Sequence, residues 1–178
     1  MILIHSIYDI ISLYTHFIAI DFIYKGISGY IIYPIGVVLS LSIERILKII
    51  TTNSSFVPFK RPDGACNCNI LNSGGIVDTA SGFPSGHVAS TSVYMTLLFF
   101  DSNNEKNVYF FLIYHIPTLL MGIARYMKKC HNLLQICAGF IIGVMVAYAL
   151  YYHFKIAQHK IKRISSLKHK ESKEIIKE

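Results

Sequence analysis

The sequence predicts an all-α bundle of about five membrane-spanning helices, and three observations support this prediction. Of the 178 residues, 53% are hydrophobic. These residues fall in long blocks rather than in the alternation that half-buried strands require. Polar loops separate the blocks, and a basic segment follows the last one. We therefore assign residues 1–153 to one membrane-embedded domain and residues 154–178 to a basic tail.

The first apolar block, Met1–Tyr24, is compatible with two arrangements. His5, Asp9, Ser12 and His16 recur at helical spacing and form one polar stripe. A membrane-spanning helix would turn this stripe to the bundle interior, whereas an interfacial helix would lie flat on the membrane. We favour the spanning arrangement.

Four further blocks follow, and a helix needs about 20 apolar residues to cross the hydrocarbon core. The blocks are Ile27–Ile43, with helical continuation to Ile50, then His87–Phe100, Val108–Ala124 and Leu133–Tyr152. Two blocks separate the long loop Thr51–Pro84 from the short loop Arg125–Asn132. Both loops therefore lie on one membrane face, where they can build a single site.

The positive charge is concentrated at the C-terminal end. The net charge is +7, and eight of the seventeen Lys and Arg residues follow His153. A basic segment directly after an apolar block is typical of a cytoplasmic anchor near anionic lipid. We therefore expect a bilayer and no nucleic acid as partner. A cytoplasmic tail places the two loops on the lumenal or extracellular side.

The four cysteines do not have the spacing of a zinc site. Cys66 and Cys68 lie in the long loop, Cys130 in the short loop, and Cys137 within the last apolar block. A disulfide from Cys66 or Cys68 to Cys130 and free thiols are both compatible with this distribution.

Three polar clusters lie at the ends of apolar blocks on the predicted loop face. They are Lys60-Arg61-Pro62, Pro84-Ser85-Gly86-His87, and Arg125 with His131. Arginine binds phosphate oxygens through two donors, and a helix N-terminus offers free N–H groups. One histidine can attack phosphorus while another protonates the leaving oxygen. Because these loops hold no carboxylate cluster, we expect a phosphate-ester site with neither metal nor other cofactor.

In these motifs the chain resembles the type 2 phosphatidic acid phosphatase superfamily, which includes bacterial acid phosphatases and vanadium haloperoxidases. The family motifs are Lys-x6-Arg-Pro, Pro-Ser-Gly-His and Ser-Arg-x5-His-x3-Asp. The chain reads Arg61-Pro62, then Pro84-Ser85-Gly86-His87, then Ala124-Arg125-x5-His131-x3-Gln135. The resemblance covers roughly residues 48–135 and implies a helix bundle that acts on lipid phosphates.

The resemblance also implies roles for single residues. His131 would be the nucleophile and form a phosphohistidine, and His87 would be the general acid and then the base for water. Arg61, Arg125 and the backbone amides of Ser85 and Gly86 would hold the phosphate.

The chain departs from the family motifs at three positions. The family lysine falls on Ser54, so either Lys48 or Lys60 would take its place, and we favour Lys48. The serine before Arg125 is Ala124. The family aspartate is Gln135, one helical turn after His131, which can accept a hydrogen bond but adds no charge.

The expected activity is therefore metal-independent hydrolysis of a lipid phosphomonoester or diphosphate at a membrane. Two alternatives follow from the same residues. Loss of the carboxylate at Gln135 would suit a catalytically impaired phospholipid-binding protein of the same fold. A phosphotransferase would pass the phosphoryl group to an acceptor other than water.

Overall fold

The computed structural model describes residues 7–12, 20–21, 24, 30–68, 74–77, 80–102 and 107–175. Within these residues the regular structure is helical, with two isolated antiparallel bridges and no strand, so the all-α class is confirmed. Most of the block Met1–Tyr24 lies outside the described residues. The helices are α2 (Ile32–Thr51), the 3₁₀ helix η1 (Val57–Phe59), α3 (Gly86–Asp101), α4 (Val108–Tyr114), α5 (Ile116–Met127) and α6 (Leu133–Ile175).

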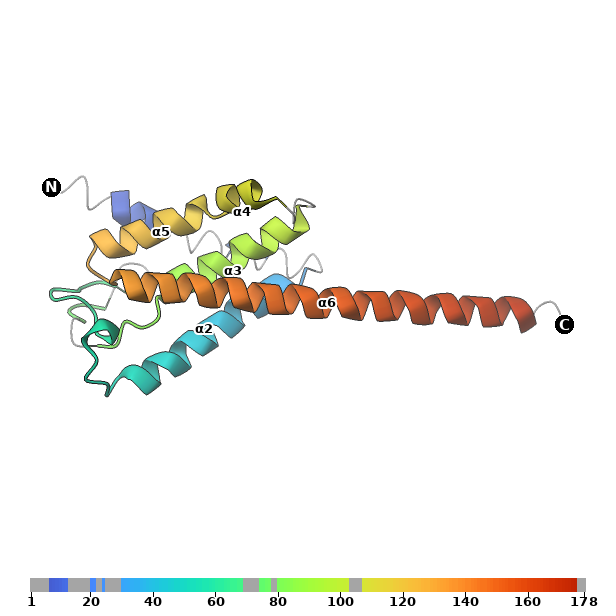
Figure 1. Cartoon of the computed structure of the whole chain (residues 1–178), viewed down its shortest axis with the longest axis horizontal. Helices are drawn as coiled ribbons and strands as arrows, with labels where there is room; N and C mark the ends of the chain where they lie inside the picture. Colours follow the sequence, from blue (N-terminus) through green and yellow to red (C-terminus); the bar gives the residue numbers. More distant parts are fainter. Residues whose placement is uncertain are drawn as a thin grey trace.

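The helices run roughly along one axis, so that their ends gather at two poles (Figure 1). The C-terminal ends of α2 and α5 meet the N-terminal ends of α3 and α6 at one pole, beside η1. α3 is the central helix and packs against α6, α2 and α5. α6 continues without a break through the basic segment and projects beyond the opposite pole.

Two glycines bring the backbones of α3 and α6 close together. A Cβ atom at Gly139 would lie 2.5 Å from the Ser85 carbonyl oxygen, and one at Gly143 would lie 2.5 Å from the Ala89 carbonyl oxygen. Small residues at this spacing allow helices to approach closely. The close approach fixes the start of α3 against the first turns of α6.

The block Val108–Ala124 forms two helices rather than one. α4 ends at Tyr114 and α5 begins at Ile116, with a bend of 45° between them. Pro117 lies in the first turn of α5, where its missing N–H is tolerated, but in one continuous helix it could not donate to the Ile113 carbonyl oxygen, and its ring would clash with that group. The bend therefore follows from the proline.

Among the described helices, residues 133–157 alone are long and apolar enough to cross a membrane. The pair α4 and α5 meets the same criterion only as one bent unit. Only 28% of the apolar window in α6 is buried, and Ile141, Met145 and Tyr148 are exposed on it. This outer surface suits lipid, while the arrangement of five spans stays a prediction.

The close packing of α3 on α6 predicts that Gly143→Ala destabilises the protein by about 1–3 kcal/mol, because the new methyl group meets backbone that cannot move. Gly122→Ala is the matched control. Its methyl group would meet one side-chain atom, Cγ2 of the partly exposed Ile136, at 3.0 Å. Thermal unfolding in detergent should show the larger loss for Gly143→Ala, and equal losses would contradict the prediction.

Candidate functional site

His131 and Gln135 form a buried pair at the start of α6. His131 Nδ1 lies 3.0 Å from Gln135 Oε1. Gln135 Nε2 donates to the carbonyl oxygens of Pro58, at 2.9 Å, and Lys60, at 2.7 Å. Because these carbonyls can only accept, they fix the amide with its oxygen toward His131. His131 therefore donates its Nδ1–H, and its Nε2 carries the lone pair.

The start of α3 is tied to the same glutamine through the main chain. The Ser85 N–H donates to the Gln135 carbonyl oxygen at 2.9 Å. This amide therefore already has an acceptor within the protein, and its role as a phosphate ligand stays a prediction. Ser85 Oγ is buried and has no hydrogen-bond partner in the described part of the chain. The hydroxyl is thus the group that Ser85 can offer to a ligand.

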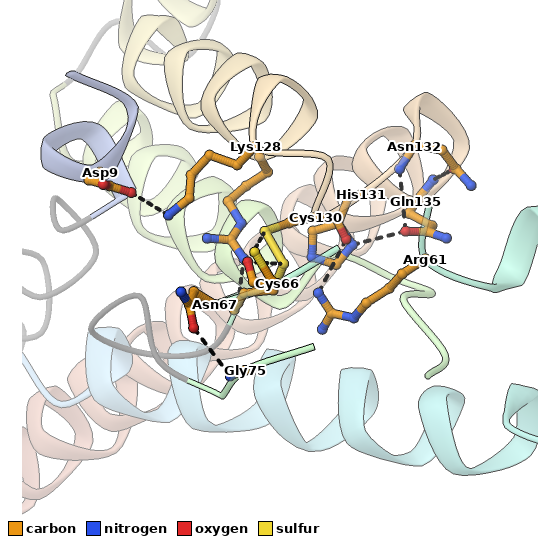
Figure 2. The surroundings of a disulfide bond; sticks show 12 residues. Asp9, Arg61, Cys66, Asn67, Gly75, Lys128, Cys130, His131, Asn132 and Gln135 are labelled. Carbon is orange, nitrogen blue, oxygen red and sulfur yellow. Dashed lines mark hydrogen bonds and ion pairs between the residues drawn. A yellow bond between two sulfur atoms is a disulfide. The ribbon is translucent and has the colours of Figure 1, made fainter. Parts of the chain in front are cut away.

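A disulfide joins the two loops beside the histidine. Cys68 pairs with Cys130, while Cys66 and Cys137 are free thiols, which decides between the pairings that the sequence left open. Figure 2 shows Arg61 and His131 next to this bond. The backbone carbonyl oxygen of each disulfide cysteine also accepts a hydrogen bond from an arginine. Arg61 Nη1 donates to Cys130 at 3.2 Å, and Arg125 Nη2 donates to Cys68.

Both arginines keep buried donor atoms for which the described residues provide no partner. These atoms are Nε of Arg61 and Nε and Nη1 of Arg125. Arg125 is fully buried and Arg61 is 8% exposed. A buried donor without an acceptor costs about 1–3 kcal/mol, and more when it is charged. An anion bound here would supply the acceptors.

The two candidate lysines occupy different environments. Lys60 is exposed, and its backbone carbonyl oxygen is taken by Gln135. Lys48 lies near the C-terminal end of α2 and forms an ion pair with Glu44. Glu44 is buried, and its carboxylate contacts the start of α3 at Gly86. Lys48, rather than Lys60, is thus connected to the helix N-terminus, through the Glu44 carboxylate.

Sequence reasoning missed two acidic partners of this site. The spacing of Glu44 four residues before Lys48 was the available signal for the first. The second is Asp9, which lies 2.5 Å from Lys128 Nζ and connects the helical residues 7–12 to the short loop (Figure 2). Nothing in the chain between them signals that contact.

His87 is the second residue of α3 and is half-buried. Its carbonyl oxygen accepts hydrogen bonds from the Ser90 and Thr91 hydroxyls, which hold the first turn. The bond between Ser85 and α6 lies two residues before it. His87 therefore stands at the helix N-terminus that the motif predicted.

The surroundings of His131 keep its imidazole neutral. Burial lowers the pKa of His131 well below 6.5, and the positive charges of Arg61 and Arg125 lower it further. The hydrogen bond to Gln135 acts in the opposite direction but does not offset them. A neutral ring with a lone pair on Nε2 is the form in which histidine acts as a nucleophile.

The comparisons with known proteins give one match. A family model described as the PAP2 superfamily matches residues 28–158. That range contains both histidines, both arginines and all of the helix ends that form the site. No curated protein and no solved structure matches the chain.

The lowered pKa of His131 predicts a pH dependence of stability. Below pH of about 6.5 the unfolded chain binds a proton at this histidine that the folded protein does not, so stability falls by up to about 1.4 kcal/mol per pH unit. His131→Gln should remove this contribution. Thermal unfolding at several pH values should therefore show a shallower decline for the variant, and identical slopes would contradict the prediction.

Proposed function

This chain belongs to the PAP2 superfamily, and from that premise we propose that it is an integral-membrane lipid phosphatase. Membership of this superfamily supports a phosphatase-type activity. The observation that carries the proposal is the set of buried, unpartnered arginine and Ser85 donors beside a neutral His131. Such donors match the equatorial oxygens of a phosphoryl group in transfer.

In the proposed reaction, His131 Nε2 attacks phosphorus and the bond to the leaving oxygen breaks. His87 donates a proton to that oxygen and then takes one from water, which attacks the phosphohistidine and releases inorganic phosphate. Arg61 and Arg125 hold the phosphate oxygens, assisted by the Ser85 hydroxyl and the Gly86 N–H. No step requires a metal ion.

Lys48 is the lysine that we assign to the phosphate. Its ion pair with Glu44, whose carboxylate lies against Gly86, supports this choice, as does its positive charge, which acts on His131. Lys60 contributes through its backbone, because its carbonyl oxygen orients Gln135.

Gln135 fits an active enzyme because its orientation is fixed. In serine proteases, replacing the orienting aspartate by an amide costs about 10⁴ in rate, because the histidine adopts the wrong tautomer. Here the carbonyl oxygens of Pro58 and Lys60 hold the amide so that His131 keeps its proton on Nδ1. What the amide lacks is the negative charge that would stabilise a cationic ring.

The proposed topology has about five spans, with the site and the basic tail on opposite membrane faces. The candidate residues lie at the pole where α6 begins, and the basic end of α6 lies beyond the other pole (Figure 1). At about 1.5 Å per residue, the 43 residues of α6 reach well past a hydrocarbon core of about 30 Å. A disulfide beside the site suits a lumenal or extracellular location.

We expect the purified protein to release inorganic phosphate from phosphatidate or a prenyl diphosphate in the presence of a chelator. His131→Ala should lower this rate at least about a thousandfold, because it removes the nucleophile. His153→Ala, which removes an exposed histidine further along α6, is the matched control. No release by the parent, with phosphate still bound, would favour the impaired binding protein, and phosphoryl transfer to an added alcohol would favour the phosphotransferase.

Replacing Gln135 by glutamate tests whether the amide contributes to activity or marks the loss of a carboxylate that the enzyme needs. The new carboxylate would face the Pro58 and Lys60 carbonyl oxygens, so we expect a loss of about 1–3 kcal/mol in stability and a lower rate. Thermal unfolding and phosphate release check the two effects. A large gain in rate at unchanged stability would instead identify a degraded enzyme that lacks its carboxylate.

A further inference from the structure

We propose that Glu44 is an internal counter-anion of the phosphate site, which balances its cations when the site is empty and weakens its hold on the released phosphate. The identity of the anion rests on the proposed function. The residue itself follows from the contacts that its carboxylate makes.

Glu44 reaches the phosphate site from the neighbouring helix α2. A Cβ atom at Gly86 would lie 2.9 Å from Glu44 Oε1, so the carboxylate occupies space that only a glycine leaves open. The Glu44 side chain is 11% exposed and forms an ion pair with Lys48 one turn further along the helix. It therefore lies between Lys48 and the N-terminus of α3, where a phosphate oxygen would bind.

The Glu44 carboxylate interacts electrostatically with a second cation, Arg61. Burial lowers the pKa of Arg61, and the Glu44 carboxylate acts against that effect by stabilising the guanidinium. Asp9 is offset by its ion pair with Lys128, so the three cations Arg61, Arg125 and Lys48 and the Glu44 carboxylate leave two positive charges, which equal in size the charge of a phosphate dianion. Without Glu44 the same site would carry three.

A carboxylate at this position repels a bound phosphate and stabilises the site when it is empty. Two negative charges a few ångströms apart in a buried site repel each other strongly. The same carboxylate stabilises three clustered cations after the product has left. Removing its charge should therefore change stability and phosphate affinity in opposite directions, whereas a purely structural role would weaken both.

The test measures thermal unfolding of the full chain in detergent across a titration with inorganic phosphate. Glu44→Gln should lower the melting temperature without phosphate and lower the Kd for phosphate at least tenfold. Glu44→Asp keeps the charge but draws it back from Gly86, and should give an intermediate Kd. Asp101→Asn is the matched control, since this carboxylate accepts a hydrogen bond from Tyr33 at the opposite pole. It should lower the melting temperature and leave the Kd unchanged.

Two results would overturn the inference in distinguishable ways. If the parent binds phosphate and both Glu44 variants bind it no more tightly, Glu44 is not a counter-anion, while the proposed function stands. If the parent protein binds no phosphate, the proposed function fails and the inference fails with it.

Discussion

The orientation of one glutamine holds the candidate site together. The Gln135 backbone carbonyl oxygen accepts the Ser85 N–H, and its side-chain amide binds the segment around η1 and His131. Three parts of the chain that are distant in sequence thus meet at the first turn of α6. Every polar atom of the amide has a hydrogen-bond partner of the right kind. The fixed orientation of the amide therefore keeps the proton of His131 on Nδ1, which the charged aspartate does in the family motif.

The cost of this arrangement is a concentration of buried positive charge. Guanidinium groups lose hydration when they are buried, and the loss is repaid only if acceptors surround them. Arg61 and Arg125 each find one backbone carbonyl oxygen and keep other donors unmet. The glycine-mediated packing of α3 on α6 supplies rigidity that keeps such a site from collapsing. Unmet donors in a rigid setting are what a site built for an anion requires.

The sequence predicted the positions of the reactive residues better than it predicted the contacts that they make. The motif residues lie at helix ends as expected, because their order and spacing express local structure. The sequence did not predict the bend at His115, which depends on how Pro117 interrupts an apolar block. It also did not predict the hydrogen bond of the Ser85 amide, because the acceptor is a backbone carbonyl oxygen of α6. Glu44 escaped it because helical periodicity shows which residues share a face but not what lies opposite. The choice of Cys68 over Cys66 likewise needed the fold, as both lie in one loop.

The disulfide has a consequence for the unfolded chain. Cys68 and Cys130 are separated by 62 residues, a stretch that contains all of α3, α4 and α5. Closing a loop of that length removes conformational entropy from the unfolded ensemble worth about 4 kcal/mol in the chain-entropy treatment. The crosslink therefore keeps the carbonyl oxygens that anchor Arg61 and Arg125 near each other even before the helices assemble. Once formed, the crosslink thus favours the gathering of the anion-binding residues.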